Sequence, residues 1–413
     1  MGVVRWGAAV AMVAIAVAGC GNSTECGEYP LDDDQRRCVV ETIDEMVIET
    51  YPFAEYKGVD LDEFSNQLWS VLDDGDEHED REFLAEINKA LNMLQDGHTR
   101  MERQRLQEPA VAPVGLRETD DGVVIDRTAN GADPSLIGRR VESVDGRDVA
   151  DVLDDVDGWT EAGVDGEAAL SGTRLALSGE AGTDVELTLD GGEVVELNRR
   201  ALYDEPEVER YNGNIGYLRL DTFGFIDDLE RVDEALNELD DTDGLMIDLR
   251  DNGGGFPSVS EGFFGRLIDD EQGAFRMVDV DGQLHRELPM KPRGDAYDGD
   301  VVVLVNNRTY SASNFFTHRI VYHDRGVLVG ESTGGGAASP SRGAMLLPGV
   351  WFQVSTHVVR APDGQHAESG LAPDIRVDVD EEVTSEGDES SRVLGVTGDP
   401  VKDRAIDYLE GRQ

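Results

Sequence analysis

The sequence is poor in lysine. Of its 36 basic residues only four are lysines, against 87 aspartates and glutamates, and the formal net charge is −51. This balance excludes nucleic-acid binding, which depends on clustered lysine and arginine. Because concentrated salt screens the repulsion between like charges, so acidic a chain with so little lysine indicates a high-salt environment. The alternative is an acidic surface that binds a cationic partner. No local cluster of acids supports it, because the acidic residues are spread along the whole chain.

Long hydrophobic runs are absent except at the start of the chain. Residues 1–19 hold one arginine, no acid and an apolar run over 8–18 that is too short to span a bilayer, as in an export signal. The run ends in Val-Ala-Gly-Cys20, which resembles the lipobox of bacterial lipoproteins. We therefore predict a signal peptide at 1–19, a tether at 20–31 lipidated at Cys20, and an exported lipoprotein anchored at the membrane of the cell envelope. An ordinary signal peptide with a chance cysteine is the alternative.

Cysteine is also scarce, with three in the chain. If Cys20 carries lipid, Cys26 and Cys38 are left, and an oxidising compartment would let them form a disulfide. Closing so short a loop would stabilise the fold by about 3 kcal/mol through the entropy of the unfolded chain. Two unrelated free thiols are the alternative. No close spacing of histidine and cysteine suggests a metal site, and we expect no cofactor.

The rest of the chain divides into three parts by pattern. Residues 32–108 repeat apolar side chains every three or four positions, which predicts a helical domain. Residues 109–203 hold short alternating runs broken by glycine and aspartate, which predicts a mostly β module. A PDZ-like domain, which binds an extended peptide at a strand edge, is the natural candidate for it. Residues 204–413 alternate buried strands with helices, which predicts an α/β core.

Two segments of this α/β core carry candidate functional residues. Gly253, Gly254 and Gly255 follow the strand expected at 244–250, where bare amides can face a ligand as an oxyanion hole requires. A phosphate-binding loop would need a lysine that is missing here, whereas a flexible turn remains an alternative. Ser311 follows a second expected strand and starts a helix whose amides favour negative charge. A serine at such a position is more often a helix cap than a nucleophile.

Several segments together resemble one family, the tail-specific or C-terminal processing serine peptidases with the tricorn core protease and its relatives. The resemblance covers roughly residues 35–410 and implies a ClpP/crotonase-like α/β core with a helical and a PDZ-like part. The matching segments, in the order of the family, are Leu-Gln-Asp-Gly-His-Thr at 94–99, the glycine strand at 244–255, the nucleophile turn at 303–313, the closing strand at 370–377 and the C-terminal helix at 398–405.

The resemblance also implies how the serine is activated. One branch of the family uses a Ser–Lys dyad with the lysine shortly after the serine, but no lysine lies between Ser311 and Lys402. The tricorn-like branch uses serine, histidine and glutamate, which here correspond to Ser311, His98 and Glu368. In this scheme His98 is the general base for Ser311, and Glu368 orients and stabilises the imidazolium.

The amides of Gly254 and Ala312 are implied as the oxyanion hole, and each of these assignments has an alternative. His98 would simply cap a helix if it were not catalytic. Glu368 lies two residues before Gly370, whereas relatives are expected to have the acid three residues before that glycine. Glu368 is therefore either the acid of a loop one residue shorter or one more surface acid.

The sequence as a whole predicts a serine endopeptidase that acts on peptides or on extended or unfolded protein tails, with the β module guiding the substrate. A non-catalytic ligand- or peptide-binding protein on the same scaffold is the alternative. The observation that would decide most between them is whether His98, Ser311 and Glu368, which lie far apart in the sequence, converge within hydrogen-bonding reach.

Overall fold

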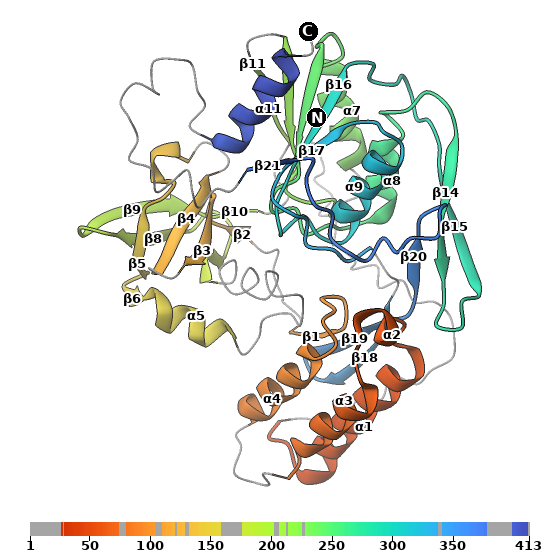
Figure 1. Ribbon diagram of the computed structural model, residues 1–413. Helices are drawn as coiled ribbons and strands as arrows, with labels where there is room; N and C mark the ends of the chain where they lie inside the picture. The colour runs from red at the N-terminus through yellow and green to blue at the C-terminus, as the bar shows by residue number, and fades with distance from the viewer. Residues whose placement is uncertain are drawn as a thin grey trace, which may run out of the picture.

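The computed structural model consists of a helical unit, a β unit and an α/β core, which lie at the bottom, left and top of Figure 1. The predicted signal peptide at 1–19 and the predicted lipid site Cys20 lie outside the described residues. In the part of the chain that is described, no helix is long and apolar enough to cross a membrane. The described residues are 26–27, 29–73, 80–103, 110–119, 122–128, 132–157, 176–201, 206–211, 214–224, 228–337, 341–377 and 399–411.

The helical unit is built from amphipathic helices with defined starts. At the start of the first helix, the Asp32 side chain accepts from the Gln35 amide and the Gln35 side chain accepts from the Asp32 amide, forming a capping box. The Asp60 carboxylate caps a later helix in a similar way, because it accepts from the Asp62 and Glu63 amides. The described helices of the unit are α1 (Asp33–Thr50), α2 (Ala54–Lys57), α3 (Leu61–Ser70) and α4 (Asp80–Asn92).

The hydrophobic core of the helical unit also contains strands from far along the chain. β1 (Arg100–Arg103) pairs antiparallel with β19 (Val350–Ser355), which pairs with β18 (Ser341–Leu347). Phe352 on β19 is buried in the same cluster as Ile43 on α1. Figure 1 shows β18 and β19, in blue, beside the red and orange helices. Residues outside 32–108 therefore contribute to the hydrophobic core of the helical unit.

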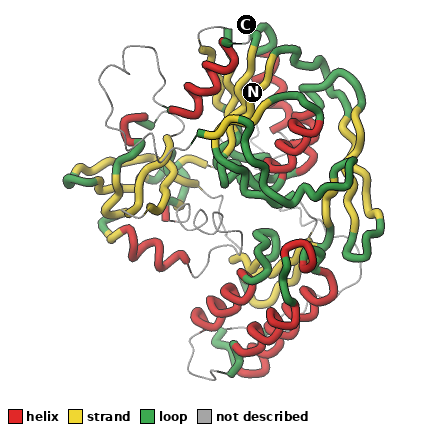
Figure 2. Tube along the Cα trace, viewed as in Figure 1, coloured by secondary structure: helices red, strands yellow, loops and turns green. Residues whose placement is uncertain are grey.

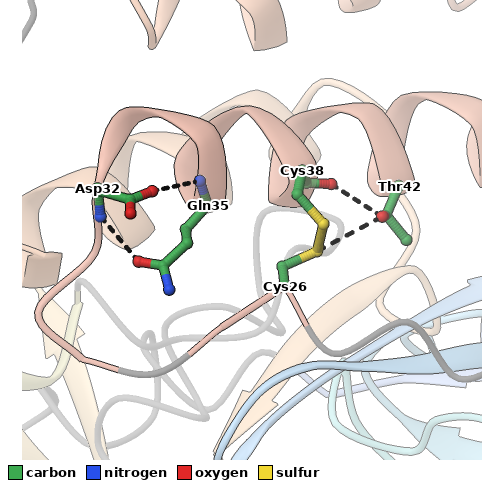
Figure 3. Close-up of a disulfide and its surroundings, with 5 residues drawn as sticks. All are labelled: Cys26, Asp32, Gln35, Cys38 and Thr42. Carbon is green, nitrogen blue, oxygen red and sulfur yellow. Dashed lines mark hydrogen bonds between the residues drawn. A yellow bond between two sulfur atoms is a disulfide. The ribbon is translucent and has the colours of Figure 1, made fainter.

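A disulfide between Cys26 and Cys38 ties the first described residues to α1 (Figure 3). The Cys26 amide donates to the Leu346 carbonyl of β18 at 2.6 Å, so the same segment is also held to the hairpin. On α1 the Thr42 hydroxyl donates to the Cys38 carbonyl at 2.8 Å. Cys26 and Cys38, which are the two cysteines besides the predicted lipid site Cys20, are therefore paired with each other.

The β unit contains an antiparallel sheet around its own hydrophobic cluster, which includes Leu116, Ile125 and Val185. Figure 2 shows it as a group of yellow strands with a red helix below them. The described sheet has the order β3 (Val114–Thr119), β4 (Gly122–Thr128), β5 (Arg140–Val144), β8 (Asp184–Leu189) and β9 (Glu193–Asn198), with β6 (Arg147–Asp148) beside β5. The remaining elements are η2 (Pro134–Leu136), α5 (Val149–Asp157), and a small sheet of β10 (Arg200–Ala201), β2 (Ala110–Val111) and β7 (Ser178–Gly179).

The α/β core is a mainly parallel sheet whose first edge strand runs antiparallel. Its described order is β11 (Glu207–Tyr211), β12 (Ile215–Arg219), β13 (Gly244–Asp248), β16 (Asp300–Val305), β17 (Val327–Gly330) and β21 (Ile375–Arg376). The other elements are α7 (Asp228–Glu238), α8 (Pro257–Phe264), α9 (Ala312–Tyr322), α11 (Pro400–Glu410), and a sheet of β15 (Leu284–Met290), β14 (Gln272–Val278) and β20 (Val358–Arg360).

Both faces of this sheet are buried, because neighbouring side chains of its central strands pack into different hydrophobic clusters. Val303 on β16 packs in one cluster with Phe316 of α9 and Phe263 of α8. Its neighbour Val302 packs in a second cluster with Val401 of α11. Because successive side chains of a strand point to opposite faces, the strands read as continuous apolar runs when helices cover both sides. This burial fixes the carboxyl ends of β13 and β16, after which the glycine segment and Ser311 follow.

The C-terminal helix α11 is held to the core by a buried ion-pair network. Arg250 donates to both carboxylate oxygens of Asp399, at 3.0 and 2.7 Å, and also to Asp248. Asp399 also caps α11, accepting from the amides of Val401 and Lys402. Burial alone would raise the pKa of Asp399, but the Arg250 guanidinium lowers it below its ordinary value. The charge of Asp399 therefore stabilises the folded chain.

We expect Asp399→Asn to lower the free energy of unfolding by about 2 kcal/mol at pH 7, because the ion pair is lost while asparagine can still cap the helix. The pKa of Asp399 is lower in the folded chain than in the unfolded chain, where it is about 3.9. Ionised Asp399 therefore stabilises the folded chain at a pH above about 3.9, and this stabilisation is lost as the pH falls through the folded-state pKa. Urea denaturation should thus show a difference in the free energy of unfolding between wild type and Asp399→Asn that is smaller at pH 3 than at pH 7. Glu410→Gln, exposed at the other end of α11, is the control and should change little. A difference that is as large at pH 3 would contradict this account.

Candidate active site

Ser311 stands where β16 leads into α9, and its backbone is not that of an ordinary helix cap. Its φ is 57° and its ψ −122°, and its side chain makes no capping hydrogen bond. Positive φ is uncommon for a residue other than glycine, and such strain clusters at functional sites. The Ser311 amide donates to the Gly335 carbonyl at 3.1 Å, which helps to hold the turn. Ser311 therefore does not serve as a cap, which removes the alternative interpretation of this residue.

His98 reaches Ser311 from the helical unit. The distance between His98 Nε2 and Ser311 Oγ is 2.8 Å, although the two residues are 213 positions apart. The His98 backbone is fixed on both sides, since its amide donates to Asp96 Oδ1 at 3.0 Å and its carbonyl accepts from Gln353 of β19 at 3.1 Å. The structure thus brings the predicted nucleophile and base into hydrogen-bonding contact, as a base that accepts the serine proton requires.

Asp96 is a buried carboxylate under the turn that carries His98. It is 1% exposed, and it accepts a hydrogen bond from the Thr99 hydroxyl at 2.6 Å. Burial alone would raise the pKa of Asp96, but the charges of Lys57 and His98 and the Thr99 hydroxyl lower it below its ordinary value. The turn therefore holds a negative charge close to the histidine.

The second nitrogen of the His98 ring lies next to Tyr310. The Tyr310 hydroxyl is 3.4 Å from His98 Nδ1, and the two ring centroids are 5.0 Å apart. Tyr310 is 4% exposed, so the hydroxyl is in a nearly dry environment. In serine–histidine catalysis this ring nitrogen faces the group that fixes the tautomer.

Glu368 is not the surface acid that its offset from Gly370 allowed, because it is 6% exposed. One of its carboxylate oxygens lies 2.9 Å from Lys57 Nζ and the other accepts from the Ala337 amide at 3.1 Å. Burial raises the pKa of Glu368 above its ordinary value, and Lys57 opposes that shift. The expected direct contact between Glu368 and the His98 ring is not among its contacts in the described structure, because a buried ammonium group attracts the carboxylate instead.

Gly254 and Ala312, the predicted oxyanion donors, both lie beside Ser311. Gly254 has a φ of +99°, and a Cβ at this position would lie 2.7 Å from Ser311 Cβ and 2.8 Å from the Ala312 nitrogen. Only glycine fits so close to the backbone. However, the Gly254 amide donates to Asn252 Oδ1 at 2.9 Å, so this amide already has an acceptor. The structure brings both residues to the site and leaves the identity of the glycine donor a prediction.

A comparison with protein families identifies the type of domain that contains Ser311. Residues 214–377 match the model of peptidase family S41, and this range contains Ser311, Glu368 and the glycine segment. The chain carries an S41 peptidase domain. His98 lies outside the matched range, although its ring contacts Ser311 within that range.

Proteins similar to this chain have names that describe proteolysis. It is 28% identical over 351 residues to the chloroplastic C-terminal processing peptidase of Tetradesmus obliquus, covering 76% of this chain and 72% of that protein. It is 26% identical over 214 residues to the tricorn protease of Thermoplasma acidophilum, covering 48% of this chain and 19% of that protein. The solved photosystem II D1 C-terminal processing protease aligns with a TM-score of 0.54 at 21% identity, over 88% of this chain and 98% of that one, which supports the fold alone. With the family match, these relatives make the chain a serine peptidase.

The sequence analysis did not predict two side chains that the structure places at the candidate site, Lys57 and Tyr310. Lys57, on α2, lies far before Ser311 in the sequence, whereas the Ser–Lys dyad has its lysine after the serine. The signal in the sequence was the scarcity of lysine, because Lys57 is one of only four in the chain. Tyr310 directly precedes Ser311, and this adjacency was the signal for it. In the described structure Lys57 bonds to Glu368 and to the Gln95 carbonyl rather than to Ser311, so it does not form the Ser–Lys dyad of the other branch.

Proposed function

We propose that this serine peptidase is an endopeptidase that cleaves peptide bonds in peptides and in extended or unfolded protein tails. The observation that carries the proposal is the 2.8 Å contact between His98 Nε2 and Ser311 Oγ, on a serine that caps no helix. The names of the relatives, a C-terminal processing peptidase and a tricorn protease, support tails and peptides as substrates. A non-catalytic binding protein would have no need to hold a serine in a strained conformation against a histidine.

In the proposed reaction, His98 Nε2 takes the Ser311 proton as Oγ bonds to the scissile carbonyl carbon. The carbonyl oxygen becomes an oxyanion, which the amides of Ala312 and of the Gly254 segment stabilise. His98 then gives the proton to the leaving amine as the carbon–nitrogen bond breaks, and water hydrolyses the acyl–serine ester by the reverse sequence of proton transfers. No step requires a metal or cofactor.

Glu368, the third residue of the proposed triad, acts in this scheme through its neighbours rather than by touching the ring. Its carboxylate is neutralised by Lys57, and Asp96 supplies the negative charge nearer to His98. The Tyr310 hydroxyl accepts from Nδ1–H, which leaves Nε2 free to accept the serine proton. The proposed arrangement is therefore Ser311 and His98 in contact, with Tyr310 fixing the tautomer.

We propose that the β unit is a PDZ-like module which guides an extended substrate by strand addition, and that the core is ClpP/crotonase-like. The antiparallel sheet with helix α5, and the parallel sheet with helices on both faces, support these assignments. We further propose export and lipid anchoring at Cys20. A disulfide between Cys26 and Cys38 is consistent with an oxidising compartment.

A serine-directed covalent probe tests the proposal. In concentrated salt, a fluorophosphonate should label the wild-type chain at Ser311, and the chain should hydrolyse an extended peptide. Ser311→Ala should abolish both, because the nucleophile is gone. Ser313→Ala is the matched control, since Ser313 lies two residues further on and is fully buried, and it should still label. A folded wild-type chain that neither labels nor hydrolyses peptides would favour the binding protein.

A further inference from the structure

The catalytic pair is assembled from two units of the fold, so something must hold the units in register. His98 belongs to the turn after α4 in the helical unit, and Ser311 to the turn before α9 in the α/β core. Their contact depends on a position accurate to a fraction of an ångström, because small displacements of reacting groups reduce rates strongly. The groups that cross this boundary next to the pair are therefore candidates for positioning it.

Lys57 makes such a crossing. Its ammonium group donates to the Gln95 carbonyl at 2.6 Å, three residues before His98. The same group lies 2.9 Å from Glu368 Oε1, in the α/β core. The Lys57 side chain is 12% exposed and that of Glu368 is 4% exposed, so solvent screens this ion pair little. One cation thus bonds to the histidine turn and to the core.

On the core side, Glu368 leads to Ser311 through a short chain of backbone contacts. Its carboxylate accepts from the Ala337 amide at 3.1 Å, and its carbonyl accepts from the Gly336 amide at 2.8 Å. The adjacent Gly335 carbonyl accepts from the Ser311 amide at 3.1 Å. The loop that Glu368 holds is therefore the loop against which the nucleophile turn rests.

On the helical side, Lys57 is itself fixed. It ends α2, and the following residue, Gly58, has φ +68° as the C-cap, with its amide donating to the Ala54 carbonyl. The Lys57 ammonium also lies 4.9 Å from the centre of the Phe53 ring, a distance at which a cation is attracted to the ring. A fixed ammonium group is a better reference point than a mobile surface lysine.

We propose that Lys57 is a positioning residue of the peptidase, which bonds the Gln95 carbonyl and the Glu368 carboxylate together and so keeps His98 in contact with Ser311. This inference rests on the proposed function. It assigns Glu368 a role that needs no contact with the imidazole. Lys57 touches neither Ser311 nor His98 in the described contacts, so its removal should affect the catalytic step more than substrate binding.

Steady-state peptide hydrolysis by the full chain tests the inference. Lys57→Met should lower kcat by about 10- to 100-fold, since the histidine turn loses its tie, while KM changes less than about threefold. The rate of fluorophosphonate labelling at Ser311 should fall in proportion to kcat. Lys89→Met is the control, because Lys89 is an exposed lysine of the same unit that pairs with Glu86 one turn away, and it should leave both rates unchanged.

Lys57→Met also leaves a buried carboxylate without its cation, so a second variant separates positioning from stability. In Lys57→Met/Glu368→Gln the unpaired charge is removed, and the melting temperature should recover toward that of the wild type. The kcat should stay low, because the tie is still missing. Recovery of kcat together with stability, or wild-type labelling in the single variant, would overturn the role of Lys57 while leaving the peptidase intact. A folded wild-type chain without Ser311-dependent hydrolysis would overturn both proposals.

Discussion

His98→Ala is expected to reduce kcat for peptide hydrolysis by about 10⁴- to 10⁶-fold, because Ser311 loses the group that accepts its proton. The contact that is lost is the 2.8 Å hydrogen bond between Nε2 and Oγ. The residual rate should come from the oxyanion donors and from substrate binding. Single-turnover hydrolysis of a chromogenic peptide ester and of an amide, followed over the same pH range, measures the loss.

The control for this variant is His285→Ala, because His285 is an exposed residue of β15 in the α/β unit. It should hydrolyse the peptide at the wild-type rate. If His98→Ala kept more than about a tenth of the activity, another group would have to activate Ser311. The nearby Lys57 would then be the group to test, because it is the lysine that the described structure places close to the site.

Gly254→Ala is expected to lower kcat by about 100-fold or more, since it displaces the nucleophile turn. The added methyl group would lie 2.7 Å from Ser311 Cβ, and 2.8 and 2.9 Å from the Ala312 nitrogen and the Tyr310 carbonyl oxygen. Two of these atoms belong to the backbone of the turn, so no side-chain rotation relieves the overlap. Peptide hydrolysis and the labelling rate of Ser311 should fall together.

Gly191→Ala separates this overlap from the cost of positive φ. Gly191 lies between β8 and β9 with φ +86°, but a Cβ there has no neighbour within 4 Å. This variant should lose about 1 kcal/mol of stability and no activity. Gly254→Ala with wild-type activity would mean that the glycine segment gives way easily, and the proposed oxyanion site would then have to lie elsewhere.

The sequence predicted those parts of the site that depend on local pattern. The apolar run 301–305 predicted a buried strand, and β16 covers Asp300–Val305. The glycines after the strand at 244–250 predicted a backbone that approaches a reacting group, and Gly254 lies against Ser311. Strand periodicity and the conformational freedom of glycine act over a few residues, so they can be read directly from the chain.

The missed parts depend on contacts between distant residues. Lys57 and Glu368 are 311 positions apart. The sequence around neither residue predicts that the Glu368 carboxylate will bond to the Lys57 ammonium group and not to the His98 imidazole. The same limit applies to the helical unit, whose apolar periodicity predicted its helices but not the β18–β19 hairpin in its core. Local pattern defines which faces are buried, whereas the partner of each face is fixed by the tertiary fold.

The hairpin of β18 and β19 also sets the order in which the enzyme can mature. Synthesis proceeds from the N-terminus, yet the turn with His98 continues into β1, whose partner β19 ends at Ser355. Until that residue has been made, β1 lacks its partner strand, and the turn with His98 lacks the contact with Gln353 that helps to hold it beside Ser311. Contacts between such distant segments form late in folding. We therefore expect the contact between His98 and Ser311 to form only when nearly the whole polypeptide is available.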